Sequence, residues 1–195
     1  MTRLAPLEPP FGPDLQRTLD RMMGGTGGEP LALFRTVAHN PQILDKFRSV
    51  GTYLLNFGTV DPLEREIVIH RTCARCGSEY EWGVHVEIYG RSLGLSDAQL
   101  RATVSGGAAD AVWSDRQSLL IRLVDELHDT NDVSDGLWSA LTESWDPAQL
   151  VELVALVGQY HLVSFFTRAF RVDLEMYGAR FRSLRLASGG RRRRA

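Results

Sequence analysis

The stretch of sequence that decides the fold covers residues 64–95 and reads EREIVIHRTCARCGSEYEWGVHVEIYGRSLGL. An α-helix turns by roughly 100° per residue, so Glu66, His70 and Cys73, at i, i+4 and i+7, lie on one face of a helix. Gly77 is the expected break after this helix. The stretch therefore predicts two successive helices, the first with polar side chains along one face.

The second helix of this stretch carries the strongest candidates for chemistry. Ser78, Glu81 and His85 stand at i, i+3 and i+7 and share one face, and Glu66 of the first helix can face the same cleft. A histidine beside a carboxylate titrates near neutral pH and can donate or accept a proton. We therefore predict His85, Glu66 and Glu81 as catalytic residues. The structural alternative is a buried polar network whose members satisfy one another.

Neighbouring side chains are candidates for the walls of a substrate pocket. We predict this role for Ser78, Tyr80, Trp82, His70 and Arg71. A reaction that develops enolate charge also needs a stabilising group, for which the candidates are Arg71, Arg75 and Tyr80. Tyr160 and His161 are further possible walls, and Glu152, a lone acid on an apolar helix, is expected to pair with His70, His161 or an arginine.

The motif Cys73-Ala74-Arg75-Cys76 invites a thiol-redox interpretation. A reactive thiol needs a helix N-terminus or nearby cations, whereas these cysteines end their helix, where the backbone dipole raises a thiol pKa. We predict that Cys73 and Cys76 are small core residues, with redox chemistry assisted by Arg71 and Arg75 as the alternative. No second Cys or His pair stands at zinc-ligand spacing, so neither a metal nor a cofactor is expected.

Composition limits the class of protein. A chain of 195 residues with 44% hydrophobic content can bury the core of one domain. A net charge of -2 argues against general affinity for nucleic acid or membranes, so a small-molecule partner is expected. The N-terminus lacks the apolar core of a signal peptide, and no run of transmembrane length is free of charge, which predicts a cytoplasmic protein.

The chain divides into three parts. Residues 1–29 are rich in Pro and Gly and predict an arm with one short helix, lying on the body or on a neighbouring molecule. Residues 30–183 show helical spacing of apolar side chains, including helices at 113–129, 134–144 and 147–170, and no stretch alternates as a strand does. Residues 184–195 predict a flexible basic tail that is solvated or binds polyanions. The sequence thus predicts an all-α fold.

Several helix starts are marked by capping residues. Asp61-Pro62 and Asp146-Pro147 each combine an N-cap carboxylate with a proline at the first helical position. Ser96 and Gln99 form a capping box, which predicts a helix from Asp97.

The residues quoted above resemble the carboxymuconolactone decarboxylase family, which includes the alkylhydroperoxidase D-like proteins. The resemblance runs from LALFRTVAHNP through DPLEREIVIHRT and SEYEWGVHVEIYGRSLGLSDAQL to LVELVALVGQYHLVSFFTRAF. It implies an alkylhydroperoxidase D-like helical fold and a homo-oligomer, as a dimer, trimer or hexamer.

The peroxidase branch of that family has a glutamate followed by Cys-x-x-Cys-x-x-x-His. Laid on this chain, the pattern puts the glutamate at Glu66 and the histidine at His85, and its cysteine positions fall on Ser78 and Glu81. Cys73 and Cys76 come too early for that pair. The decarboxylase branch also lacks the pair and keeps the histidine.

The resemblance therefore implies a cofactor-independent lyase or isomerase that acts on a small carboxylic or carbonyl substrate. One alternative is a thiol peroxidase or disulfide reductase that uses Cys73 and Cys76. Another is a non-catalytic oligomer that binds a small molecule.

Overall fold

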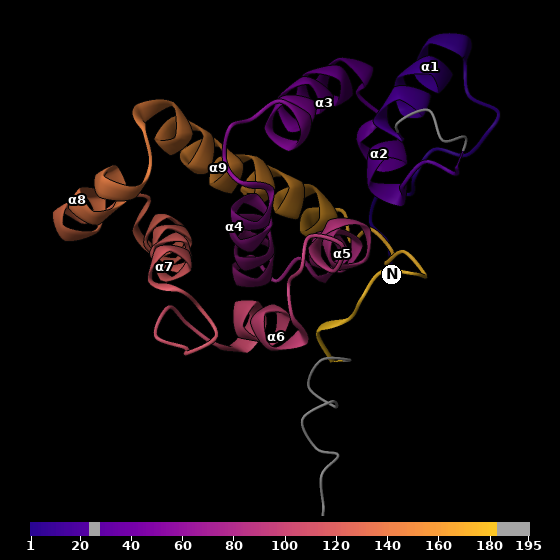
Figure 1. Ribbon diagram of the computed structural model, residues 1–195. Helices are drawn as coiled ribbons and strands as arrows, with labels where there is room; N and C mark the ends of the chain where they lie inside the picture. Colours follow the sequence, from indigo (N-terminus) through magenta and orange to yellow (C-terminus); the bar gives the residue numbers. More distant parts are fainter. Residues whose placement is uncertain (24–27, 183–195) are drawn as a thin grey trace, which may run out of the picture.

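The computed structural model describes residues 1–23 and 28–182, and within these ranges every regular element is a helix (Figure 1). The elements in chain order are α1 (Pro13–Met22), α2 (Ala32–Val37), α3 (Pro41–Asn56), α4 (Pro62–Arg75), α5 (Glu79–His85), the π-helix η1 (Val86–Gly90), α6 (Asp97–Ser105), α7 (Asp115–Thr130), α8 (Asp135–Ser144) and α9 (Pro147–Ala169). The prediction of an all-α fold is confirmed.

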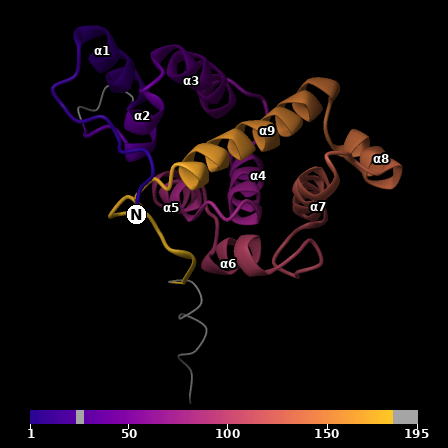
Figure 2. The ribbon, with the colours of Figure 1, turned by 180° about the vertical axis from the view of Figure 1, so that it is seen from behind.

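Helix α4 is the centre of the molecule. It packs against α7, α9, α5 and α6, and both ribbon views show α9 crossing beside it (Figures 1 and 2). Ile67, Val68 and Ile69 are consecutive residues and so point to different sides of α4, yet all three are fully buried. Other parts of the molecule therefore cover the helix on each of these sides. The polar residues of α4 are therefore held among packed helices, where each polar group needs a partner.

The predicted helix starts are confirmed, because each cap supplies acceptors for the free N–H groups of a first turn. The Asp61 carboxylate accepts from the backbone N–H groups of Leu63 and Glu64. Capping boxes form at Ser96 with Gln99 and at Asp146 with Gln149. A further capping box at Ser114 starts α7 at Asp115, which is two residues after the predicted start at 113.

The break between α4 and α5 lies where Gly77 predicted it. Gly77 has φ +65, a left-handed conformation that disfavours residues with a Cβ, and it lets the chain turn between the two helices. Helix α5 then continues from His85 directly into the π-helix η1. Sequence spacing did not predict this π-helical segment.

The N-terminal arm lies on the body of its own chain. Leu7 N–H donates to Arg35 O at 3.2 Å, and His39 Nε2 lies 3.0 Å from Ala5 O. Leu19 of α1 is fully buried. The glycine run at 24–27 and the predicted tail at 184–195 lie outside the described residues.

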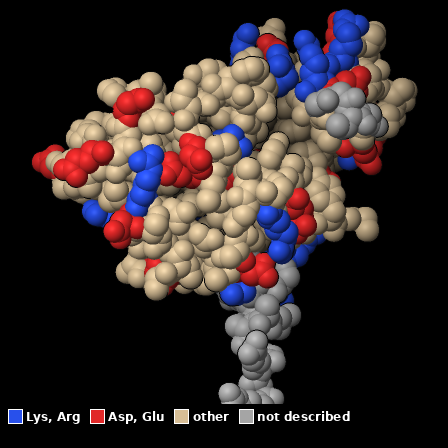
Figure 3. All heavy atoms as spheres, in the orientation of Figure 1, with Lys and Arg blue, Asp and Glu red and all other residues tan. Residues whose placement is uncertain are grey.

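Helix α9 is long and apolar enough to cross a membrane by length and composition alone, but 56% of its apolar window is buried inside the molecule. It packs against α4, α5, α3 and α8, as the core helix of a soluble protein does. Charged side chains of both signs are interspersed on the face seen in Figure 3. This surface lacks a broad field of one sign, in agreement with the small net charge.

Candidate functional site

Glu66 and His85 form the centre of the candidate site. Glu66 projects from the second turn of α4 and His85 from the last residue of α5, and His85 Nδ1 lies 2.8 Å from Glu66 Oε2. Both side chains are almost completely removed from solvent. The structure therefore brings these two predicted residues into direct contact.

The other ring nitrogen of His85 faces two further polar groups. His85 Nε2 lies 3.2 Å from the Tyr160 hydroxyl and 3.5 Å from Glu81 Oε1. Glu81 Oε2 is buried and has no hydrogen-bond partner among the described residues. Both nitrogens of the imidazole thus have oxygen neighbours, and one carboxylate oxygen beside it is left unsatisfied.

These neighbours fix the charge of His85. Burial lowers its pKa, but the charge and hydrogen bond of Glu66, together with those of Glu81, outweigh burial and raise the pKa to about 9. For Glu66, burial raises the pKa, but the facing His85, with His70 and Arg65, lowers it below its usual value. At neutral pH the pair is therefore an imidazolium beside a carboxylate.

His70 has the opposite character. Its Nδ1 lies 2.6 Å from Glu66 O and donates a hydrogen to it, and because its pKa lies well below 7 the ring is neutral, with a lone pair on Nε2. Complete burial lowers the pKa of His70 to about 4, although the negative charge of Glu66 acts to raise it. The ring packs edge-on against Trp82, whose Nε1–H donates to Thr103 Oγ1. His70 and Trp82 are therefore a wall behind the Glu66–His85 pair.

Tyr89 is a site residue that the sequence analysis missed. It lies one turn after His85, within η1, and its ring centroid is 5.1 Å from that of His85. Tyr89 is half-buried, whereas His85 and Tyr160 are buried. π-helical segments frequently occur at functional sites, because the extra residue redirects the following side chains. The position of Tyr89 four residues after His85 was the available signal.

Two predicted pocket residues have other partners. The Arg71 guanidinium forms a bidentate pair with Asp125 and donates to the carbonyls of Thr103 and Gly106. The Tyr80 hydroxyl donates to Glu175 and accepts from Leu33 N–H. These contacts hold helices and loops together, so we do not place Arg71 or Tyr80 beside His85.

Arg75 likewise pairs with Asp125 and Asp129. None of the three candidates for stabilising an enolate therefore has a hydrogen bond to the Glu66–His85 pair among the described residues.

The expectation for Glu152 is wrong. Its carboxylate accepts from Thr59 and Val60 N–H groups, which it reaches because α9 passes over the loop before α4.

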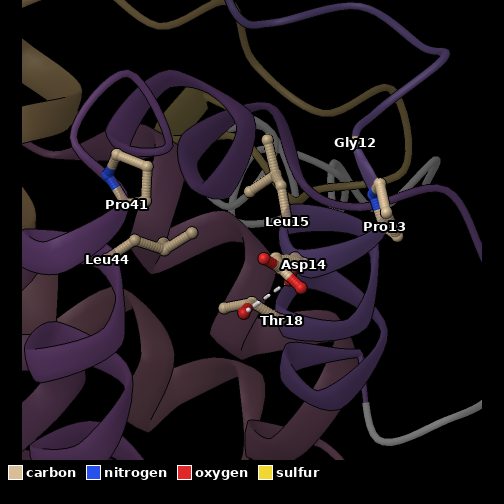
Figure 4. A pocket seen from close by; sticks show the side chains of 7 residues that line it. All are labelled: Gly12, Pro13, Asp14, Leu15, Thr18, Pro41 and Leu44. Atoms are coloured by element: carbon tan, nitrogen blue, oxygen red, sulfur yellow. Dashed lines mark hydrogen bonds between the residues drawn. The ribbon is translucent and has the colours of Figure 1, made fainter.

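Ser78 caps the start of α5, and its hydroxyl lies 2.7 Å from Thr167 Oγ1. It lines a cavity of about 560 Å³ together with Tyr80, Arg168 and Arg171. A second hollow of about 410 Å³ lies between α1 and the start of α3, where Thr18 donates to Asp14 O (Figure 4). Neither cavity is lined by His85, so these hollows are separate from the Glu66–His85 pair.

The two cysteines end α4 as predicted. Cys73 is fully buried, and burial raises its pKa well above the usual value. Cys76 is half-buried, and burial also raises its pKa, although Ser164, Arg75 and Arg168 oppose this. The direction of both shifts agrees with the sequence prediction, but the leading cause is burial and not the helix dipole.

The comparisons with known proteins place this chain by structure and not by sequence. No family model and no curated protein matches it. An uncharacterized peroxidase-related protein from Silicibacter sp. TM1040 matches with TM-score 0.78 at 14% identity, over 92% of this chain and 95% of that one. The debrominase Bmp8, in complex with 2,3,4-tribromopyrrole, matches with TM-score 0.73 at 12% identity, over 96% and 97%.

A third structure is described as an alkylhydroperoxidase AhpD core, an uncharacterized peroxidase-related protein from Ralstonia eutropha JMP134. It matches with TM-score 0.71 at 15% identity, over 89% of this chain and 93% of that one. At identities this low, the similarity shows a shared fold only and says nothing about activity. The chain has the alkylhydroperoxidase D-like fold that the sequence resemblance implied.

Proposed function

We propose that this alkylhydroperoxidase D-like chain is a cofactor-independent lyase or isomerase, in which His85 donates a proton to a small carboxylic or carbonyl substrate. The observation that supports this most strongly is the Glu66–His85 pair. His85 Nδ1 lies 2.8 Å from Glu66 Oε2, and His85 Nε2 faces Glu81 and Tyr160. A buried imidazolium whose Nδ1 is held by a carboxylate is a general acid, and its Nε2–H has one fixed direction, toward Glu81 and Tyr160.

The raised pKa of His85 indicates that the proton moves from His85 to the substrate. With a pKa of about 9, His85 holds its proton at neutral pH and acts as an acid in the first transfer. Glu66 is then a positioning residue, because it fixes the ring orientation and stabilises the imidazolium. In other carboxylate–histidine pairs, the carboxylate likewise fixes the orientation of the imidazole and stabilises its charged form.

In a decarboxylation, the C–C bond to the substrate carboxylate breaks and CO₂ leaves. The bonding electron pair passes to the adjacent carbonyl, which becomes an enolate. The His85 Nε2–H bond then breaks as the proton moves to the enolate carbon, and solvent returns a proton to the neutral imidazole. In an isomerisation, His85 Nε2–H would protonate one carbon of the substrate, and the resulting neutral imidazole would take up a proton lost from a different carbon.

The unsatisfied Glu81 Oε2 indicates where a ligand group binds. A buried carboxylate oxygen without a partner costs about 1–3 kcal/mol or more, since it has lost water and gained nothing. A substrate hydroxyl or an enol O–H placed there would donate to it, and the reacting carbon would lie near His85 Nε2. Tyr89 is the half-buried aromatic neighbour of His85, and we propose that a ligand enters past it.

Proton exchange tests this proposal without knowledge of the natural substrate. A panel of small 2-oxo and 3-oxo acids is incubated with the protein in D₂O, and NMR follows carbon-bound deuterium and loss of the carboxylate. We expect turnover of at least one panel member, reduced about 10²–10⁴-fold in His85→Gln. The matched control is His39→Gln, an exposed histidine whose Nε2 lies 3.0 Å from Ala5 O in the arm.

Two results would contradict the proposal. One is a panel on which the wild-type protein gives no exchange and no loss of carboxylate. The other is turnover that survives in His85→Gln at the wild-type rate.

A thiol peroxidase is the second candidate function. It is supported by the half-buried Cys76, whose Sγ lies 3.9 Å from His128 Nδ1 and near Arg75 and Arg168. Peroxide consumption with a dithiol reductant separates the two functions. Under the peroxidase proposal Cys76→Ser abolishes consumption, whereas under the lyase proposal Cys73→Ser with Cys76→Ser leaves exchange on oxo acids unchanged.

We further propose that the chain acts in the cytoplasm as a homo-oligomer. The exposed side of α9 supports association, because from Val151 to Phe165 it presents only uncharged residues. This stripe, defined here as the α9 stripe, consists of Val151, Val154, Ala155, Gly158, Leu162 and Phe165. It runs for about 21 Å at the rise of an α-helix. An apolar surface without charges meets no electrostatic repulsion from a copy of itself, so the proposed occupant is the α9 stripe of a second copy.

A further inference from the structure

We infer that Cys76, His128 and His161 form a binding site for a thiophilic divalent cation of the zinc class. One ligand atom from each residue lies within 4.8 Å of the others. Cys76 Sγ is 3.9 Å from His128 Nδ1, and His128 Nδ1 is 3.0 Å from His161 Nε2. The site shares no residue with the Glu66–His85 pair.

The separations fit one tetrahedral ion. Zinc–nitrogen bonds of about 2.0–2.1 Å and zinc–sulfur bonds of about 2.3 Å put two nitrogens roughly 3.3 Å apart and a sulfur and a nitrogen roughly 3.6 Å apart. The observed 3.0 Å and 3.9 Å differ from these values by a few tenths of an ångström. Small side-chain rotations therefore suffice for these two pairs, and the third pair, Cys76 Sγ and His161 Nε2, already lies within 4.8 Å.

The tautomer of His161 is already the one that binds metal. Its Nδ1 lies 2.8 Å from Val157 O, one helical turn earlier in α9, so Nδ1 carries the hydrogen and Nε2 offers a lone pair. Histidine ligands commonly donate their other N–H to a backbone carbonyl in this way. The lone pair of His161 Nε2 faces His128 Nδ1, at the place where the ion would lie.

Three different helices hold the ligands. Cys76 caps the end of α4, His128 lies in the last turn of α7, and His161 lies in the middle of α9. Since α4 packs against both α7 and α9, the core packing itself positions the three side chains. All three are half-buried, which leaves a side open for a water or an exogenous fourth ligand.

The surrounding charges act in two ways. Arg75 and Arg168 lie near Cys76 and favour its thiolate, which is the form that ligates a metal. The same cations oppose the charge of a bound ion, while Asp125 and Asp129 lie on the His128 side and favour it. A cysteine with two histidines suits Zn²⁺, whereas Mg²⁺ and Ca²⁺ prefer oxygen ligands.

Metal titration of the purified full-length chain tests the inference. Metal-free protein is titrated with Zn²⁺ in competition with a chromogenic chelator, and separately with Co²⁺, whose absorption reports geometry and thiolate ligation. We expect one Zn²⁺ per chain, and a tetrahedral Co²⁺ spectrum with a thiolate charge-transfer band. Mg²⁺ should compete with neither ion.

Variants separate this site from adventitious binding. Cys76→Ser should remove the charge-transfer band, and His161→Gln should weaken Zn²⁺ binding at least about 100-fold. Cys73→Ser, which alters the other cysteine of the same motif, and His39→Gln should bind as the wild type does. Circular dichroism confirms that each variant keeps its helix content.

The inference fails if metal-free protein takes up no Zn²⁺, or if Co²⁺ binds without the thiolate band. It also fails if Cys76→Ser and His161→Gln, both folded, bind Zn²⁺ as the wild type does. None of these results bears on His85, so the metal site and the lyase proposal stand or fall separately.

Discussion

At the scale of single residues, the two histidines of the Glu66–His85 region differ in charge at neutral pH, although both are buried: His85 is positively charged and His70 is neutral. His85 has two carboxylates near its ring and a raised pKa, whereas His70 donates to a backbone carbonyl and has a lowered one. Burial acts in the same direction on both. The neighbouring oxygen atoms therefore decide which histidine can donate a proton.

These pKa shifts predict how stability depends on pH. The pKa of His85 rises from 6.5 to about 9 on folding, so the folded chain binds more protons than the unfolded chain in that window and stability falls as pH increases through it. The pKa of His70 falls to about 4, so stability rises with pH between about 4 and 6.5. We expect the urea midpoint to be highest near pH 6.5.

Substitutions identify the source of each slope. His85→Gln should flatten the fall in urea midpoint above pH 6.5, and His70→Gln should flatten the rise below it. An unchanged pH profile in both variants would show that neither histidine has the environment described.

Glu66→Gln tests the positioning role of Glu66. The amide keeps the size of the side chain but removes the charge that raises the His85 pKa, so His85 should lose its proton at lower pH. The alkaline limb of the pH–rate profile should therefore move to lower pH, with a smaller loss of turnover than in His85→Gln. Arg65, whose Nε lies 3.4 Å from Glu66 Oε1, offers a control, because Arg65→Gln should move the limb less. An alkaline limb that stays in place in Glu66→Gln would remove Glu66 from this role.

The sequence predicted which residues belong to the candidate site better than it predicted how their side chains are arranged. Helical spacing brought Ser78, Glu81 and His85 to one face, and the resemblance paired His85 with Glu66. The sequence could not show which way Arg71 points, because its partner Asp125 lies 54 residues away, on another helix. The proposed metal ligands could not be found from sequence for the same reason, since they come from three helices and form no spacing motif.

At the scale of helices, capping residues predicted most starts to within two residues, because capping is a local interaction. The π-helix η1 and the segment after α9 were not predicted, since both depend on tertiary packing. Residues 178–181 cross α5, where Ala179 N–H donates to Gly83 O at 3.1 Å. This crossing explains why the middle of α5 contains a glycine.

Gly83→Ala tests the crossing. A Cβ at position 83 would lie 2.2 Å from Ala179 O, which is backbone and cannot rotate away. We expect a loss of about 2 kcal/mol or more in the free energy of unfolding, measured by urea titration. Gly136 in α8 has nothing within 4 Å of an added Cβ, so Gly136→Ala should be neutral or stabilise by about 0.5–1 kcal/mol. Equal effects of the two substitutions would contradict the close approach.

At the scale of the whole molecule, the α9 stripe is an apolar surface on a helix that is otherwise part of the core. Phe165 is 61% exposed and Val151 is 71% exposed, and no charged residue separates them on this side. Exposed apolar stripes of this kind mark association sites more often than free surface.

Phe165→Glu should dissociate the oligomer, because a carboxylate would be buried without a charged partner in the proposed apolar contact between two copies. Sedimentation velocity measures the assembly, and Met176→Glu, at another exposed apolar side chain, is the control. A monomeric wild-type chain, or an oligomer that persists in Phe165→Glu, would exclude the α9 stripe as the interface.

The proposed proton transfer depends on His85 being a buried imidazolium held by Glu66. The most direct measurement is a ¹⁵N NMR titration of the histidine side chains in the full-length chain, with His85→Gln used to assign the signal. We expect His85 to stay doubly protonated at neutral pH and to titrate near pH 9, and we expect its pKa to fall in Glu66→Gln. A His85 signal that is neutral at pH 7, or that titrates at its unperturbed value in both proteins, would contradict the proposed proton transfer.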